Sequence, residues 1–131
     1  MQDLPDKATL LAGIAKFLDA DVRPVIEDRA TAFRVRIAAH LLGTVIREMQ
    51  AEGTHDRAEL KALQSLLGQP IDVSDDAQIR RKAIAQANRV LADGIRDGQI
   101  ALDDAHPVLM EALAARLQVS NPRFDFDRDL P

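Results

Sequence analysis

Two arginines and one histidine line one side of a segment, residues 29–51, whose hydrophobic pattern predicts a helix. Arg36, His40 and Arg47 are separated by four and seven residues, so a helix places them on one side. Two guanidinium groups beside an imidazole can hold a carboxylate or a phosphate. Alternatively, the arginine stems cover apolar surface and their charged ends pair with aspartates or helix-end carbonyls. The sequence leaves both interpretations of this cationic seam open.

A second polar group belongs to the predicted helix over residues 74–97. Asn88 borders the apolar side of this helix, which makes it a candidate ligand-binding residue alongside the cationic seam. The simpler expectation is that its amide hydrogen-bonds a neighbouring backbone group. Arg80 falls in line with the apolar residues, whereas Arg81 and Arg89 lie elsewhere on the helix. With no aromatic residue interleaved for base stacking, the helix predicts a solvated basic patch and not a nucleic-acid site.

The sequence favours neither a metal centre nor a catalytic site. The three histidines stand alone and the chain has no cysteine, so no metal and no cofactor are expected. Asp125, Asp127 and Asp129 imitate the start of a calcium loop, but Leu130 stands at the sixth position, which needs glycine. Nucleotide-binding and nucleophile motifs are missing from the sequence. No catalytic residue is therefore assigned, and the sequence leans towards a protein that is not an enzyme.

Two of the four phenylalanines lie in the C-terminal segment, residues 121–131. Phe124 and Phe126 alternate with aspartates, a pattern that predicts an extended tail with one apolar side. A large aromatic side chain left in water is unfavourable by roughly 1.5–3 kcal/mol, so this side is expected to be covered. Either the tail folds back over the chain or it docks on a partner, with Asn121 and Arg123 in the same segment.

Capping and helix-ending residues divide the chain into five predicted helices. Aspartate is poor inside a helix but favourable at its N-cap, and the chain has 16 aspartates against five glutamates. Gly53 is expected to end the second helix and Gly68 the third. Asp56 and Glu59 look like a capping box for the third helix, and Ser74 like the cap of the fourth. The predicted helices cover residues 6–19, 29–51, 56–67, 74–97 and 103–120.

The composition fits a small all-α protein. The chain has 131 residues, a formal net charge of −4, 21 alanines and 16 leucines, and these side chains lose little rotamer freedom in a helix. Short connections favour a single compact bundle, one domain over residues 1–131. The second helix is apolar nearly all round, which predicts a central position. Since no apolar run is long enough to span a membrane, a cytoplasmic location is expected.

Three segments, in their order along the chain, resemble a known family. They are residues 33–42 (FRVRIAAHLL) followed by Arg47-Glu48, residues 88–91 (NRVL) leading to 95–98 (IRDG), and residues 121–124 (NPRF). Together with Leu10-Leu11 and Phe17-Leu18, they are similar to a bacterial all-helical family of unknown function. Its members are found beside, or joined to, aminoglycoside-phosphotransferase-like kinases, often near acyl-CoA dehydrogenases.

The resemblance brings no catalytic residue with it. It implies a non-catalytic accessory or interaction module that acts with such a kinase in acyl-CoA-related catabolism. The alternative is a protein, or weak enzyme, that binds an anionic ligand such as an acyl-CoA or a phosphate ester through the cationic seam. A homodimer is a further expectation, and a membrane partner is not expected. His40 departs from the family, where relatives have asparagine. The residues that match recurring polar positions are Arg36, Asn88, Arg89, Arg96, Asn121 and Arg123.

Overall fold

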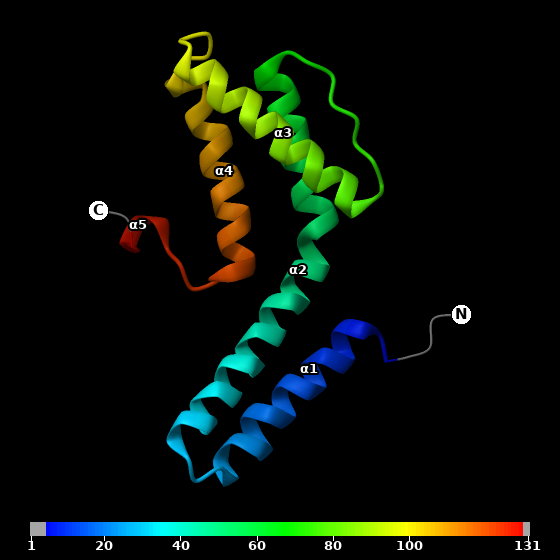
Figure 1. Ribbon diagram of the computed structural model, residues 1–131, viewed down its shortest axis with the longest axis vertical. Helices are drawn as coiled ribbons and strands as arrows, with labels where there is room; N and C mark the ends of the chain where they lie inside the picture. The colour runs from blue at the N-terminus through cyan, green and yellow to red at the C-terminus, as the bar shows by residue number, and fades with distance from the viewer. Residues whose placement is uncertain (1–4, 130–131) are drawn as a thin grey trace. The chain divides into compact units, whose positions relative to one another are not determined.

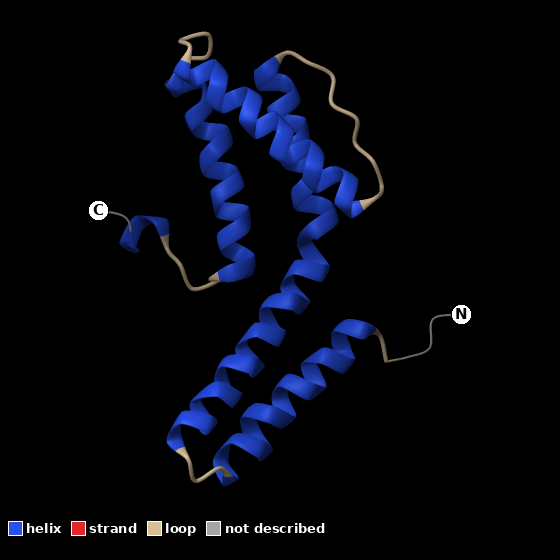
Figure 2. Ribbon diagram, in the orientation of Figure 1, coloured by secondary structure: helices blue, strands red, loops and turns tan. Residues whose placement is uncertain are grey.

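A computed structural model describes residues 5–129, and for Glu52 the backbone alone. These residues contain helices and no strand, which confirms the predicted all-α class (Figure 2). A π turn, Leu18–Val22, and a 3₁₀ turn, Arg23–Val25, connect the first helix to the second. The α-helices are α1 (Lys7–Phe17), α2 (Arg29–Leu67), α3 (Ala77–Arg96), α4 (Leu102–Ser120) and α5 (Phe126–Asp129).

Two compact units divide α2 between them. The first unit is Met1–Gln50 and the second is Ala51–Pro131. The first is a helical hairpin in which α1 runs antiparallel to the N-terminal part of α2 (Figure 1). The second contains the C-terminal part of α2 together with α3, α4 and α5. Because α2 contributes to both units, a single domain over residues 1–131 stays a prediction.

Helix α2 is one helix of 39 residues where two were predicted. Gly53 does not end a helix, and the Arg57 guanidinium donates to its carbonyl at 2.9 Å. A glycine inside a helix costs about 1 kcal/mol relative to alanine. Two additional helix ends would instead leave several backbone groups without partners. Asp56 and Glu59 therefore lie in the interior of α2, and the predicted capping box is wrong.

Several other helix ends were predicted correctly. The carboxylate of Asp6 caps α1 by accepting from the backbone N–H of Thr9 at 2.8 Å. Gly68 follows α2 with φ 63°, and Gly98 follows the C-cap of α3 with φ 72°. Glycine adopts this left-handed backbone without the steric penalty that other residues meet. The chain therefore turns where these two glycines stand.

The N-cap of α3 differs from the prediction. The Asp76 carboxylate accepts from the backbone N–H groups of Gln78 and Ile79 at 2.8 and 3.0 Å. Ser74, the predicted cap, accepts instead from the backbone N–H of Asp76 at 3.1 Å. A carboxylate satisfies two of the unpaired donors and is favoured by the helix dipole, so Asp76 takes the cap position.

The buried core lies in the second unit. Leu63 of α2, Leu91 and Ala87 of α3, and Ala105 of α4 form one buried cluster. The predicted packed side of α3 is confirmed, since Arg80 is buried in line with apolar residues. Three helices thus share a core that is rich in leucine and alanine. The buried residues of α3 are Arg80, Ile84, Ala87, Leu91 and Gly94.

The N-terminal part of α2 is not the enclosed centre that its apolar pattern predicted. None of residues 5–50 is buried, and Phe33, Ile37 and Leu41 are 60%, 41% and 56% exposed. A two-helix hairpin has no third element to cover its outer sides, so much of this apolar surface faces water. The core forms around the other end of α2, at Leu60 and Leu63.

The C-terminal tail is not wholly extended as predicted, because α5 forms one helical turn. The Asp125 carboxylate accepts from the backbone N–H of Asp127 at 3.0 Å, and the Asp129 carboxylate accepts from that of Asp125 at 2.9 Å. Such local side-chain bonds to the backbone outweigh the alternating Phe and Asp pattern. Leu130, the sixth position of the calcium-like sequence, lies outside the described residues.

Candidate functional site

The cationic seam lies in the first unit, on the N-terminal part of α2. Arg36 and His40 are exposed, and Arg47 is half-buried. The Arg47 guanidinium donates through Nη2 to the hydroxyl of Thr44 at 3.1 Å, and this hydroxyl donates to the His40 carbonyl at 3.4 Å. The structure therefore keeps the three predicted residues on one side of one helix, where the exposed guanidinium of Arg36 can attract an anion.

Asn88 belongs to the second unit and is engaged with α2. Its amide Nδ2 donates to Oε1 of Glu59 at 3.2 Å, and Nη2 of Arg116 donates to the same oxygen at 2.6 Å. The expected backbone partner of Asn88 is thus wrong, because the partner is a carboxylate. The Glu59 side chain is 12% exposed. Its carboxylate connects α2, α3 and α4 through one oxygen atom.

Glu59 was missed because it was interpreted as part of a helix cap. On a continuous α2, Glu59 adjoins Leu60 and lies four residues before Leu63, and both leucines are fully buried. A carboxylate on the packed side of a helix needs hydrogen-bond donors from the neighbouring helices. That position on the packed side is the sequence signal that would have identified Glu59.

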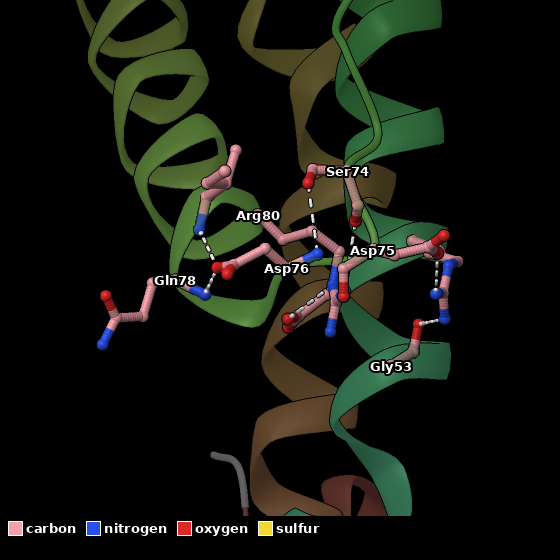
Figure 3. Close-up of polar contacts among 9 residues, drawn as sticks. Gly53, Ser74, Asp75, Asp76, Gln78 and Arg80 are labelled. Atoms are coloured by element: carbon pink, nitrogen blue, oxygen red, sulfur yellow. Dashed lines mark hydrogen bonds and ion pairs between the residues drawn. The ribbon is translucent and has the colours of Figure 1, made fainter.

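A second polar cluster holds the loop between α2 and α3, drawn in Figure 3. The Arg80 side chain is 5% exposed, and its Nε lies 3.4 Å from Oδ2 of Asp56. Its Nη1 donates to the backbone carbonyls of Ser74 and Asp75 at 3.1 and 2.6 Å. The Asp75 carboxylate accepts in turn from Arg57 of α2 at 2.9 Å. The loop is therefore fixed from both helices.

The buried groups of the two polar clusters in the second unit are hydrogen-bonded within the chain. In the side chains that the structure describes, residues 5–51 and 53–129, no buried nitrogen or oxygen lacks a hydrogen-bond partner. A catalytic carboxylate must instead reach a proton of the substrate. The donors and acceptors around Glu59 and Arg80 are directed to the chain itself, so these groups position helices.

The predicted interaction tail folds on itself. The rings of Phe124 and Phe126 pack edge to face, with centroids 5.2 Å apart and planes at 85°. Arg128 donates to the Arg123 carbonyl at 3.3 Å, and the Asn121 carbonyl accepts from the backbone N–H of Phe124 at 2.9 Å. Both rings stay half-buried. All four predicted tail residues are thus brought together in one short segment, and docking on a partner stays a prediction.

An exposed apolar surface covers one side of the first unit, which sequence reasoning did not single out. Its side chains are between 43% and 57% exposed. In each helix they recur every three or four residues, which is the spacing of a stripe along one side. We call this surface the first-unit face. Its residues are Leu10, Ile14 and Phe17 of α1 and Leu41, Val45 and Met49 of α2.

The two stripes lie on the same side of the hairpin. Half-buried Leu11 and Ala15 mark the packed side of α1, and half-buried Ala39 and Ile46 that of α2. Successive residues are rotated by about 100° around a helix axis. Viewed along each helix from its N-terminus, the exposed stripe is rotated by roughly 100° from the packed side, and the direction of rotation is the same in α1 and α2. In an antiparallel pair, equal displacements in one sense point to one side. The cationic seam is displaced in the opposite sense and lies on the other side of the hairpin.

Among the side chains of residues 5–51 and 53–129, no group of three or more His, Asp or Glu is placed to hold a metal ion. In the same part of the chain, no helix has both the length and the apolarity needed to cross a bilayer.

Comparison with known proteins gives one match. The model of a family described as Domain of unknown function (DUF6285) matches residues 24–124. The matched stretch contains α2, α3 and α4, with the cationic seam and both polar clusters. No curated protein and no solved structure matches the chain.

Proposed function

We propose that the chain, which belongs to the DUF6285 family of domains of unknown function, is a non-catalytic helical interaction module. The observation that carries this proposal is the first-unit face. Covering a large apolar side chain contributes roughly 1.5–3 kcal/mol, so covering six half-exposed ones contributes several kcal/mol. Scattered exposed apolar residues are ordinary, whereas a contiguous set on one side marks an interaction site.

The partner class follows from the resemblance described above. It is an aminoglycoside-phosphotransferase-like kinase that acts on a small molecule, in acyl-CoA-related catabolism in the cytoplasm. The tail offers a contact for this partner, because Phe124 and Phe126 present an edge-to-face pair of partly exposed rings. Aromatic side chains dominate the energetics of protein interfaces. Asn121 and Arg123 are exposed in the same segment and supply polar groups.

Co-purification of the full chain with the neighbouring kinase-like protein tests this proposal. A complex is expected when both are present at micromolar concentrations, and the double variant Phe124→Ala/Phe126→Ala is expected to weaken it at least about tenfold. Phe33→Ala is the matched control, because Phe33 is 60% exposed and lies outside both the tail and the first-unit face. No complex with the wild-type chain would contradict the kinase partner.

A second candidate function is the binding of an anionic ligand by the cationic seam. It is favoured by the exposure of Arg36 and His40 on a common side of α2. A ligand that binds only the folded chain raises its melting temperature. Acyl-CoAs, nucleotides and sugar phosphates are therefore to be compared by thermal shift, with Arg36→Ala expected to abolish any shift. If no compound shifts the wild type, this candidate fails.

A further inference from the structure

We infer that the protein covering the first-unit face is a second copy of this chain. The inference rests on the proposed function, in which that face is an interaction surface, and it names the occupant. Two hairpins related by a two-fold axis and packed face to face make a four-helix bundle. In such a bundle every helix of the two hairpins borders a common apolar core, which the isolated hairpin lacks.

The apolar area of the face suits a dimer. Five aliphatic side chains of up to about 120 Å² and one phenylalanine of roughly 200 Å², each about half exposed, offer on the order of 400 Å² of apolar surface. A standard interface buries about 800 Å² on each partner. About 65% of a homodimer interface is apolar, which is on the order of 500 Å² per copy. The first-unit face therefore supplies most of the apolar surface that one partner of a stable homodimer contributes.

Helix α1 is complementary to an antiparallel copy of itself. Lys7 and Asp21 are exposed, carry opposite charges and each stand seven residues from Ile14. Lys7 is the first residue of α1 and Asp21 lies in the π turn that follows it, so a cation stands at one end of the α1 stripe and an anion beyond the other. In an antiparallel pair centred on Ile14, Lys7 of one copy faces Asp21 of the other. Leu10 then faces Phe17, and the apolar stripe is continuous.

The distribution of charge argues against a lipid surface as the occupant. A helix that lies on an anionic membrane carries lysine and arginine flanking its apolar side. Here the cationic seam lies on the opposite side of the hairpin, and Lys7 and Asp21 balance each other along α1. Along α2, Arg34 stands in line with the stripe, seven residues before Leu41, and Glu48 borders it, so the face carries both signs of charge, which suits a copy of the same hairpin.

The oligomeric state of the full chain tests the inference. Sedimentation equilibrium at micromolar concentration is expected to give twice the chain mass of 14.4 kDa. Ile14→Glu places a charge at the centre of the face and is expected to weaken the dimer about 100-fold. Because Ile14 is 50% exposed, the substitution leaves the monomer folded, as circular dichroism would show. Leu102→Glu is the matched control, since Leu102 is 61% exposed in the second unit, and it is expected to stay dimeric.

A charge exchange tests the antiparallel arrangement. Lys7→Glu and Asp21→Lys each place like charges opposite one another across the two-fold axis and are expected to weaken the dimer about two- to fivefold. The double variant Lys7→Glu/Asp21→Lys restores opposite charges and is expected to regain wild-type affinity. Additive weakening in the double variant would overturn the arrangement centred on Ile14.

The outcomes separate this inference from the proposed function. A wild-type chain that is monomeric at 100 µM, or a dimer that Ile14→Glu leaves intact, overturns the second copy as occupant. If the monomer binds the kinase-like protein and Ile14→Glu abolishes that complex, the face is an interaction site with another occupant. If the chain is monomeric and binds no kinase-like protein, both proposals fail.

Discussion

Arg80 of α3 and Asp56 of α2 form an ion pair that is nearly enclosed by the second unit. Arg80 Nε lies 3.4 Å from Asp56 Oδ2, and the two side chains are 5% and 17% exposed. Removing two charges from water costs more than their attraction returns unless further hydrogen bonds satisfy the groups. The carbonyls of Ser74 and Asp75 provide those bonds, so the guanidinium, the carboxylate and the loop depend on one another.

Replacing the buried guanidinium should destabilise the second unit strongly. Arg80→Met keeps much of the side-chain volume but leaves Asp56 and two backbone carbonyls without their donor. We expect the free energy of unfolding to fall by about 3 kcal/mol. Urea unfolding followed by circular dichroism measures it, because the chain has no Trp or Tyr to report by fluorescence. Arg89→Met, at an exposed position of α3, should stay within about 0.5 kcal/mol of wild type.

The carboxylate of Glu59 should be coupled to its donors. Glu59→Gln keeps the shape but removes the charge that Asn88 and Arg116 approach, and we expect a loss of about 1–2 kcal/mol in unfolding free energy. Arg116 is 59% exposed, so solvent screens its ion pair with Glu59 and reduces the contribution of this pair to the unfolding free energy. A double-mutant cycle with Arg116→Gln should give a coupling of about 0.5–1 kcal/mol. Strictly additive effects would show that the 2.6 Å contact contributes nothing.

Two helical glycines should respond to alanine with opposite signs. A Cβ on Gly94 would lie 2.7 and 3.1 Å from Cδ1 and Cγ1 of Ile100, so Gly94→Ala should destabilise by about 1–2 kcal/mol. At Gly13 nothing lies within 4 Å, and Gly13→Ala should stabilise by up to about 1 kcal/mol. Thermal unfolding distinguishes the two, with shifts in Tm of about 4 °C per kcal/mol. Equal shifts of the same sign would refute the packing of Ile100 on α3.

The cap at the start of α2 should make stability depend on pH. The pKa of Asp28 lies below its ordinary value of 3.8, because the carboxylate accepts from the hydroxyl and the backbone N–H of Thr31. A lowered pKa in the folded state stabilises the fold above pH 3.8, and this contribution is lost as the pH falls through the folded-state pKa. Compared with Asp28→Asn, the wild type should have the higher Tm at pH 7. The difference in Tm between the two proteins should be smaller at pH 2. A difference that is the same at both pH values would contradict the role of the ionised carboxylate.

Helix ends could be predicted where the signal is local. Gly68 and Gly98 adopt positive φ, which few other residues accept, and the Asp6 cap depends only on Thr9 three residues away. The helix end predicted at Gly53 was wrong, because the continuity of α2 depends on contacts from residues distant in sequence. Asp56 and Glu59 bind partners on other helices that lie 24 or more residues away in sequence.

The candidate site was predictable to the same extent. Helical periodicity correctly placed Arg36, His40 and Arg47 on one side of one helix. It did not reveal the partner of Asn88, because that depends on which helix packs opposite. The apolar pattern on all sides of residues 29–51 also did not show what covers the helix. A helix covered by its own chain and a helix covered by another molecule have the same apolar pattern. Only the structure shows that the first-unit face is left exposed.

The uneven burial of α2 should be visible in amide hydrogen exchange. Around Leu60 and Leu63 the backbone is covered by the core, so exchange there requires opening of the second unit. Residues 33–45 belong to the same helix but have no buried side chain, and their amides should exchange through local openings of lower free energy. One continuous helix would then carry two levels of protection, and a partner that covers the first-unit face would raise the lower one.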